Sequence, residues 1–176
     1  MAGARSLCCW ITMLVAMVCG SLAQAADTLA ASGLDELGDQ ALINAILAYY
    51  QAEQAHDWQT TYALRGARFA AVVPYDAYAH QMDIDAGGWA LIAIDGRSVR
   101  VDGGMTSVTL SFQEDLAQDV AARLLGPELA THAEAGAVQR YSQLEVTQWV
   151  MEDGQWVALA PGARQHFVFN ERMVWN

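Results

Sequence analysis

The chain contains no lysine, and it has only three cysteines and three prolines. Its nine basic residues are all arginines, scattered singly among twenty acidic residues, and the formal net charge is -11. Proteins that bind nucleic acid through phosphates present clustered positive charge, so this composition argues against such binding. The hydrophobic fraction of 54% is too high for a disordered chain. The sequence therefore indicates one compact folded domain.

The three cysteines all lie within a segment that has the features of an export signal. Arg5 precedes an apolar stretch over residues 7–18, and Ala23-Gln24-Ala25 follows as a small-residue cleavage site. We therefore expect a signal peptide over residues 1–25, cleaved after Ala25. The protein would then be periplasmic or secreted.

Two alternatives to a cleaved signal stay open. A retained membrane anchor would need about 20 apolar residues, and this stretch is shorter. A lipoprotein signal at Cys19 would need a small residue before the cysteine, whereas Val18 is bulky. Cleavage after Ala25 would leave no cysteine, so the exported chain could form no disulfide, thiolate nucleophile or cysteine-ligated metal site.

The first half of the remaining chain reads as helical. Residues 26–34 are small and aperiodic, which predicts a tether before a single domain over residues 35–176. A helix is predicted from Asp35 to Ala55. Asp57 can cap a second helix, and Gly66 can end it. The second and third helices are predicted over 58–64 and 74–82, and the apolar face of the first comprises Leu42, Ile43, Ile46, Leu47 and Tyr50.

From residue 89 the hydrophobic pattern alternates, which is typical of strands. Asp95-Gly96 has the composition of a two-residue hairpin turn. The predicted strands cover residues 89–94, 98–101, 106–112, 141–151, 155–159 and 165–170, with a helix over 114–125 and an irregular connection over 126–136.

Three helices followed by an antiparallel meander predict an α+β fold in which a curved sheet wraps around the first helix. Tyr49-Tyr50-Gln51-Ala52 leading to His56-Asp57-Trp58, the helix start Pro74-Tyr75-Asp76, and the hairpin over 149–156 resemble the NTF2-like superfamily. This superfamily of cone-shaped domains includes ketosteroid isomerase and the SnoaL-like cyclases. The resemblance implies a pocket between the sheet and the helices, and members use such a pocket for catalysis or for binding small molecules. Segment 114–136 departs from it, because the family's usual strand connection is shorter.

An isomerase of this type would need a carboxylate base facing an acid in an apolar pocket. Glu145 is the best candidate base, with Tyr50 or Tyr78 as its hydrogen-bonding partner. In the alternative that we favour, Glu145 lies on a solvated face and the tyrosines are core residues. The candidate pocket residues are Tyr50, Trp58, Tyr62, Tyr78 and Trp149.

No other constellation in the sequence indicates a catalytic or metal site. His80, Asp83 and Asp85 have the residue types of metal ligands, but their spacing matches no metal motif, and we expect ordinary surface residues. We interpret His56-Asp57 as structural, since Asp57 has a helix to cap. Nucleophile-elbow, Walker and dinucleotide-binding motifs are absent from the sequence. We therefore predict no metal and no cofactor.

The sequence favours a non-catalytic binding or accessory module of the bacterial cell envelope, with no membrane span after cleavage. The expected partners are a small apolar molecule or an envelope protein, and a homodimer stays open. One alternative is a small isomerase, cyclase or hydrolase, and another is a protein-docking domain that uses its open sheet face. The aromatic side chains would line a cavity in an enzyme or binder and form a surface patch in a docking domain.

Overall fold

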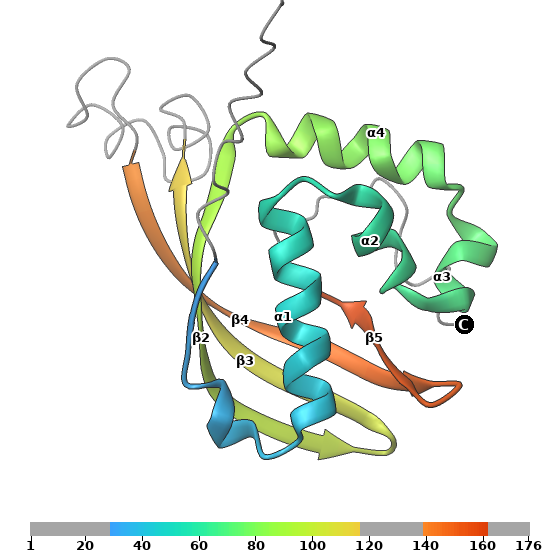
Figure 1. The fold of residues 1–176 in the computed structure, drawn as a ribbon, viewed down its shortest axis with the longest axis vertical. Helices are drawn as coiled ribbons and strands as arrows, with labels where there is room; N and C mark the ends of the chain where they lie inside the picture. The colour runs from blue at the N-terminus through green and yellow to red at the C-terminus, as the bar shows by residue number, and fades with distance from the viewer. Residues whose placement is uncertain (1–28, 117–138, 162–176) are drawn as a thin grey trace, which may run out of the picture.

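The computed structural model describes residues 29–116 and 139–161. These residues form an α+β fold in which helices pack on one side of a curved five-stranded sheet (Figure 1). The predicted fold class is thus confirmed. The elements are β1 (Ala30–Ser32), the 3-10 helix η1 (Leu34–Leu37), α1 (Gln40–Gln54), α2 (Trp58–Ala63), α3 (Gly66–Val72), α4 (Tyr75–Ala86), β2 (Trp89–Asp102), β3 (Met105–Leu116), β4 (Gln139–Glu152) and β5 (Gln155–Ala160).

The order of the strands in the sheet follows the order of the chain, from β1 to β5. The short β1 runs parallel to β2, and the other neighbours are antiparallel. Helix α1 lies along the concave face of the sheet, and α2, α3 and α4 lie on the same side (Figure 1). The predicted signal peptide, the segment 117–138 and the predicted last strand over 165–170 lie outside the described residues.

The N-terminal segment is more structured than the sequence predicts. Residues 30–32, expected within a tether, form β1, and Leu29 and Leu34 are buried in the core. The predicted first helix is also interrupted, because Gly38 adopts a left-handed φ of 77° between η1 and α1. Asp39 then caps α1, since its carboxylate accepts hydrogen bonds from the first backbone N–H groups.

Helix α3 is missing from the sequence prediction, because its N-terminus is capped by a residue distant in the sequence. The Glu152 carboxylate on β4 accepts a hydrogen bond from the Ala67 backbone N–H at 2.7 Å. Gly66 has a φ of 80°, and a Cβ at this position would clash with the same carboxylate. Gly66 therefore separates α2 from α3, as predicted for the end of α2, and also permits the contact with β4.

The predicted hairpin at Asp95-Gly96 is wrong, because β2 continues without a turn from Trp89 to Asp102. Gly96 instead allows the backbone of β2 to lie close to the backbone at Gly33, since a Cβ at position 96 would lie 2.7 Å from the Gly33 carbonyl oxygen. The Asp95 carboxylate accepts a hydrogen bond from Ser32 Oγ at 2.9 Å. A bulge between Gly96 and Ser98 accommodates the irregularity.

The predicted helix over 114–125 is wrong for its first three residues, which complete β3. The alternation of Val108, Leu110 and Phe112 continues through Glu114 and Leu116, and all five side chains are buried. The predicted turns at 102–104 and 152–154 are confirmed as the β2–β3 and β4–β5 connections.

Two buried clusters hold the helices and the sheet together. The larger lies between α1 and the concave face and includes Ile46, Tyr50, Phe112 and Trp149. The smaller lies among α2, α3 and α4. In the part of the chain that the structure describes, no helix is long and apolar enough to cross a membrane.

Candidate functional site

Four aromatic rings pack together where α1 meets the concave face of the sheet. Tyr50 lies edge-on to Phe112, with ring centroids 5.2 Å apart, and Trp149 lies 6.0 Å from Tyr49 and 6.5 Å from Tyr50. The Tyr50 hydroxyl donates a hydrogen bond to the Pro161 carbonyl at 2.7 Å. This group therefore joins α1, β3 and β4 to the chain just after β5.

A second aromatic group lies among the helices. Tyr62 and Tyr78 have ring centroids 5.3 Å apart, and the Tyr62 hydroxyl donates to the Val73 carbonyl at 2.6 Å. The Trp58 indole N–H donates to the Asp83 carboxylate. The Tyr62–Tyr78 and Trp58–Asp83 contacts join α2 to α4, and the Tyr62 hydroxyl joins α2 to the end of α3, so together they fix the helices relative to each other.

The five predicted pocket residues are therefore divided between two packed clusters. Tyr50 and Trp149 belong to the sheet cluster, and Trp58, Tyr62 and Tyr78 belong to the helix cluster. A side chain that lines a water-filled cavity keeps some solvent-accessible surface. Tyr50, Tyr78 and Trp149 have none, so these three rings line no such cavity.

Tyr78 is held as a neutral phenol. Burial disfavours the phenolate and raises the pKa of Tyr78 far above its usual value, and Tyr49 adds to this effect. The Tyr78 hydroxyl donates to Thr61 Oγ1 at 2.8 Å, in a buried contact between α4 and α2. Burial also raises the pKa of Tyr62. Neither hydroxyl can act as a general base at neutral pH.

Glu145 lies on the inner face of β4 and is partly exposed. It alternates there with Thr147 and Trp149, as the sequence predicts, whereas Leu144 and Val146 point to the opposite face and are largely exposed. Glu145 pairs in register with Leu110 of β3. Its position on the inner face differs from the solvated face that we favoured, although the residue is not fully buried.

The structure adds a second carboxylate to this face that the sequence analysis missed. Glu114 on β3 is only 3% exposed, and the Gln143 amide nitrogen on β4 lies 3.4 Å from both of its carboxylate oxygens. We call Glu114, Gln143 and Glu145 the inner polar row. The alternation of apolar residues in β3 continues to Glu114, and it is the sequence signal for this residue, although the sequence analysis predicts a helix from residue 114.

Two further charged residues are buried at the junction of α1, α2 and β5, and neither was predicted. Glu53 has no exposed surface, and Arg65 is 1% exposed. The Arg65 guanidinium donates to the Leu159 carbonyl at 3.2 Å and lies 4.2 Å from the centre of the Phe69 ring. The burial of Glu53 could have been predicted from its position in the sequence, because Glu53 continues the buried stripe of Ile46, Tyr49 and Tyr50 at helical spacing.

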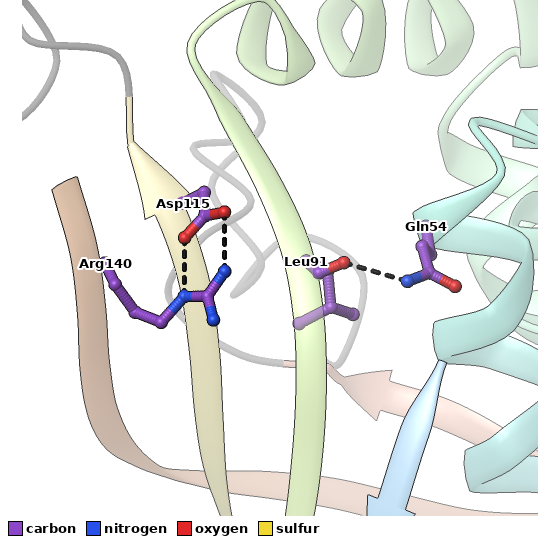
Figure 2. Close-up of polar contacts among 4 residues, drawn as sticks. All are labelled: Gln54, Leu91, Asp115 and Arg140. Carbon is purple, nitrogen blue, oxygen red and sulfur yellow. Dashed lines mark hydrogen bonds and ion pairs between the residues drawn. The ribbon is translucent and has the colours of Figure 1, made fainter. Parts of the chain in front are cut away.

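Polar contacts tie the strands to their surroundings at the end of the sheet near α4 (Figure 2). The Gln54 amide of α1 donates to the Leu91 carbonyl at 3.0 Å, beside a bulge in β2. Across β3 and β4, the Arg140 guanidinium donates two hydrogen bonds to the Asp115 carboxylate, at 2.7 and 2.8 Å. This forked contact joins the last residues of β3 to the first residues of β4.

The structure describes the side chains of two of the three possible metal ligands, His80 and Asp83. His80 and Asp83 are exposed on α4, and Asp83 accepts the hydrogen bond from Trp58. Nothing is described for the Asp85 side chain. Among residues 29–116 and 139–161, apart from that side chain, no three histidine, aspartate or glutamate residues come together as they would around a metal ion.

A shallow depression of about 160 Å³ lies on the side of the sheet away from α1. Three alanines of β1 and β2 form part of it, and Asp95, Arg97, Ser111 and Gln113 complete its polar wall. The Arg97 guanidinium lies 2.7 Å from the Asp95 carboxylate. This depression is outside the cone, so it is not the pocket that the sequence resemblance implies.

No protein-family model and no curated protein matches the chain. One similar solved structure is a SEC-C motif-containing protein from Rhodopseudomonas palustris, with 12% identity and a TM-score of 0.40 over 62% of this chain and 67% of that one. Another is described as a "putative ketosteroid isomerase" from Shewanella frigidimarina, with the same identity and TM-score over 73% of this chain and 95% of that one. At this TM-score neither similarity assigns a family or an activity to the chain.

Proposed function

We propose that the chain is an exported, non-catalytic binding or accessory domain of the NTF2-like type. The assignment to that fold family rests on α1 lying along the concave face of the curved sheet and on the sequence segments 49–58 and 149–156. Export to the periplasm or beyond rests on the signal-like segment over residues 1–25.

The observation that carries the non-catalytic assignment is where the two candidate acids direct their protons. A phenol has one proton, and Tyr50 donates it to the Pro161 carbonyl while Tyr78 donates it to Thr61. A general acid must lie within hydrogen-bond reach of its substrate. Because both tyrosines lack exposed surface, a substrate would have to open the core to reach them.

Ligand binding is proposed at the half-exposed end of the inner face of β4. The inward residues Tyr141, Gln143 and Glu145 keep partial exposure, whereas Thr147 and Trp149 further along the strand are buried. Tyr141 offers an apolar ring and Glu145 a carboxylate acceptor. A small molecule with an apolar body and a hydrogen-bond donor fits this surface.

The test is a screen of small apolar compounds that carry a hydrogen-bond donor, read by tryptophan fluorescence and by product analysis. We expect binding without turnover, and weaker binding by Glu145→Gln with unchanged stability. Ser142→Ala, an exposed position on the other face of the same strand, is the matched control and should bind as the wild type does. Turnover of any compound that Glu145→Gln abolishes would refute the non-catalytic assignment and favour the isomerase alternative.

A further inference from the structure

The depression on the side of the sheet away from α1, which we call the hollow, combines a small apolar surface with charged and polar groups. The apolar part consists of the short side chains of Ala30 and Ala31 on β1 and of Ala93 on β2. The volume of about 160 Å³ corresponds to about five water molecules, since each occupies about 30 Å³ in the liquid. The hollow therefore has room for a ligand of about five or six non-hydrogen atoms, which is much smaller than a drug-sized molecule.

The Asp95 carboxylate is held in position at the hollow by three neighbours. Its Oδ1 accepts a hydrogen bond from Ser32 Oγ at 2.9 Å, and its Oδ2 lies 2.7 Å from the Arg97 guanidinium. Gly33 makes room for the carboxylate, because a Cβ at that position would lie 2.5 Å from Oδ1. A carboxylate has about four acceptor positions. Both oxygens can therefore accept a further hydrogen bond from a ligand.

The Asp95–Arg97 pair presents both signs of charge to the hollow. The two side chains are 30% and 55% exposed, so a ligand from solution can reach each of them. A ligand with a single positive charge is attracted by Asp95 but repelled by Arg97, and a ligand with a single negative charge meets the reverse. A ligand that carries both charges, oriented opposite to the pair, is attracted by both side chains.

Two side chains of β3 add hydrogen-bonding groups beside this charged pair. Ser111 pairs in register with the neighbour of Ile94, Asp95, and Gln113 pairs with Ala93, and both line the hollow. The Ser111 hydroxyl can accept a hydrogen bond from an ammonium group, and the Gln113 amide can donate one to a carboxylate. The hollow thus combines hydrogen-bond acceptors, hydrogen-bond donors and an apolar surface.

We propose that the hollow binds a small zwitterionic α-amino acid of the size of glycine or alanine. The ammonium group of the ligand donates hydrogen bonds to the Asp95 carboxylate and the Ser111 hydroxyl, and the carboxylate of the ligand accepts from the Arg97 guanidinium. The ligand has no net charge, so the net charge of -11 on the chain does not oppose its approach. This site lies on the opposite side of the sheet from the ligand surface proposed on β4, so the two proposals can fail separately.

The first test is a titration of the isotope-labelled protein, recovered after expression of the full chain, followed by amide NMR spectra at neutral pH. The probes are alanine, ethylamine and propionate, and the last two are alanine without its carboxylate and alanine without its ammonium group. We expect alanine to shift the amide signals of residues 30–32 and 93–97 along a curve that saturates. Ethylamine and propionate should bind at least about tenfold more weakly, the usual effect of losing a charged hydrogen bond. Equal binding of either fragment, or no saturable shift with alanine, would overturn the proposal.

The second test locates the site with variants. Asp95→Asn keeps an acceptor for Ser32 but removes the charge, and it should weaken alanine binding by at least about tenfold. Ala93→Leu fills the hollow and leaves the charged pair in place, and it should abolish binding. Asp102→Asn is the matched control, because Asp102 forms an ion pair of the same kind at 2.9 Å on the same strand, outside the hollow, and this variant should bind alanine as the wild type does.

Dispersed amide spectra check that each variant is folded. Arg97→Gln removes the other charge of the pair at a largely exposed side chain, so it provides the same test if Asp95→Asn does not fold. Folded Arg97→Gln or Ala93→Leu variants that bind alanine as tightly as the wild type would refute this site. Equal weakening by Asp102→Asn would refute it as well, because the effect would then not depend on the hollow.

Discussion

Ile46 occupies the middle of the α1 face that packs on the sheet and has no exposed surface. We expect Ile46→Ala to lower the free energy of unfolding by about 2–5 kcal/mol, the usual cost of a large-to-small change in a packed core. Gln51 is exposed on the opposite side of the same helix. Gln51→Ala should change stability by less than about 0.5 kcal/mol, measured by urea denaturation. Equal losses at both positions would contradict the packing of α1.

The Tyr50 hydroxyl gives a second prediction at the scale of a residue. Tyr50→Phe keeps the ring contacts with Phe112 and Trp149 but leaves the Pro161 carbonyl without this donor. We expect a loss of about 1–3 kcal/mol in the free energy of unfolding, the cost of a buried polar group left unsatisfied. Tyr75→Phe, at a ring that is 40% exposed, is the control and should be nearly neutral. An unchanged stability for Tyr50→Phe would show that the Pro161 contact does not contribute.

At the scale of the elements, the packing of the segment after β1 against β2 depends on the absence of a side chain at Gly96. Gly96→Ala would place a Cβ 2.7 Å from the Gly33 carbonyl oxygen, so the two backbones would have to separate. We expect this variant to be clearly destabilised, by more than about 1 kcal/mol, with faster amide exchange in β1. Gly87→Ala is the control, because its nearest contact would be 3.4 Å and its φ of -63° is ordinary. That variant should be neutral or slightly stabilised.

The forked contact between β3 and β4 predicts a dependence on pH. The Arg140 guanidinium hydrogen-bonded to Asp115 lowers the pKa of that carboxyl below its usual value. A lowered pKa in the folded state stabilises the fold above the unfolded pKa of about 3.9, and this contribution disappears as the pH falls through the folded pKa. Asp115→Asn should therefore be less stable than the wild type at pH 6, and the difference should vanish toward pH 2. A difference that stays constant over this range would exclude the ion pair as its cause.

At the scale of the whole molecule, the predicted export signal can be tested on the purified protein. Cleavage after Ala25 would give an N-terminus at Ala26, only a few residues before the buried Leu29, and a protein without thiols. N-terminal sequencing and a thiol assay test both statements. A start at Met1 or a lipid-modified Cys19 would contradict the predicted location.

The sequence alone determined the features that depend on neighbouring residues. The spacing of Leu42, Ile43, Ile46 and Tyr50 predicted the buried face of α1, and Asp57 predicted the cap of α2. Alternation predicted β3, β4 and their faces, because successive side chains of a strand point to opposite sides. With the helices first and the strands after them, these signals were enough for the α+β class.

Only the tertiary structure decided the features that depend on residues far apart in the chain. The sequence around Gly96 predicts a turn, but the structure uses this glycine to accommodate the backbone of Gly33. Gly33 lies 63 residues earlier in the chain, so the local sequence carries no sign of this contact. Helix α3 begins at a carboxylate supplied by Glu152 of β4, and Glu114 joined the inner polar row only once β4 lay beside β3. The predicted pocket aromatics divided into two packed clusters for the same reason. The local sequence pattern indicates which face of a helix or strand is apolar, whereas the packing of distant elements determines whether that face lines a cavity or fills a core.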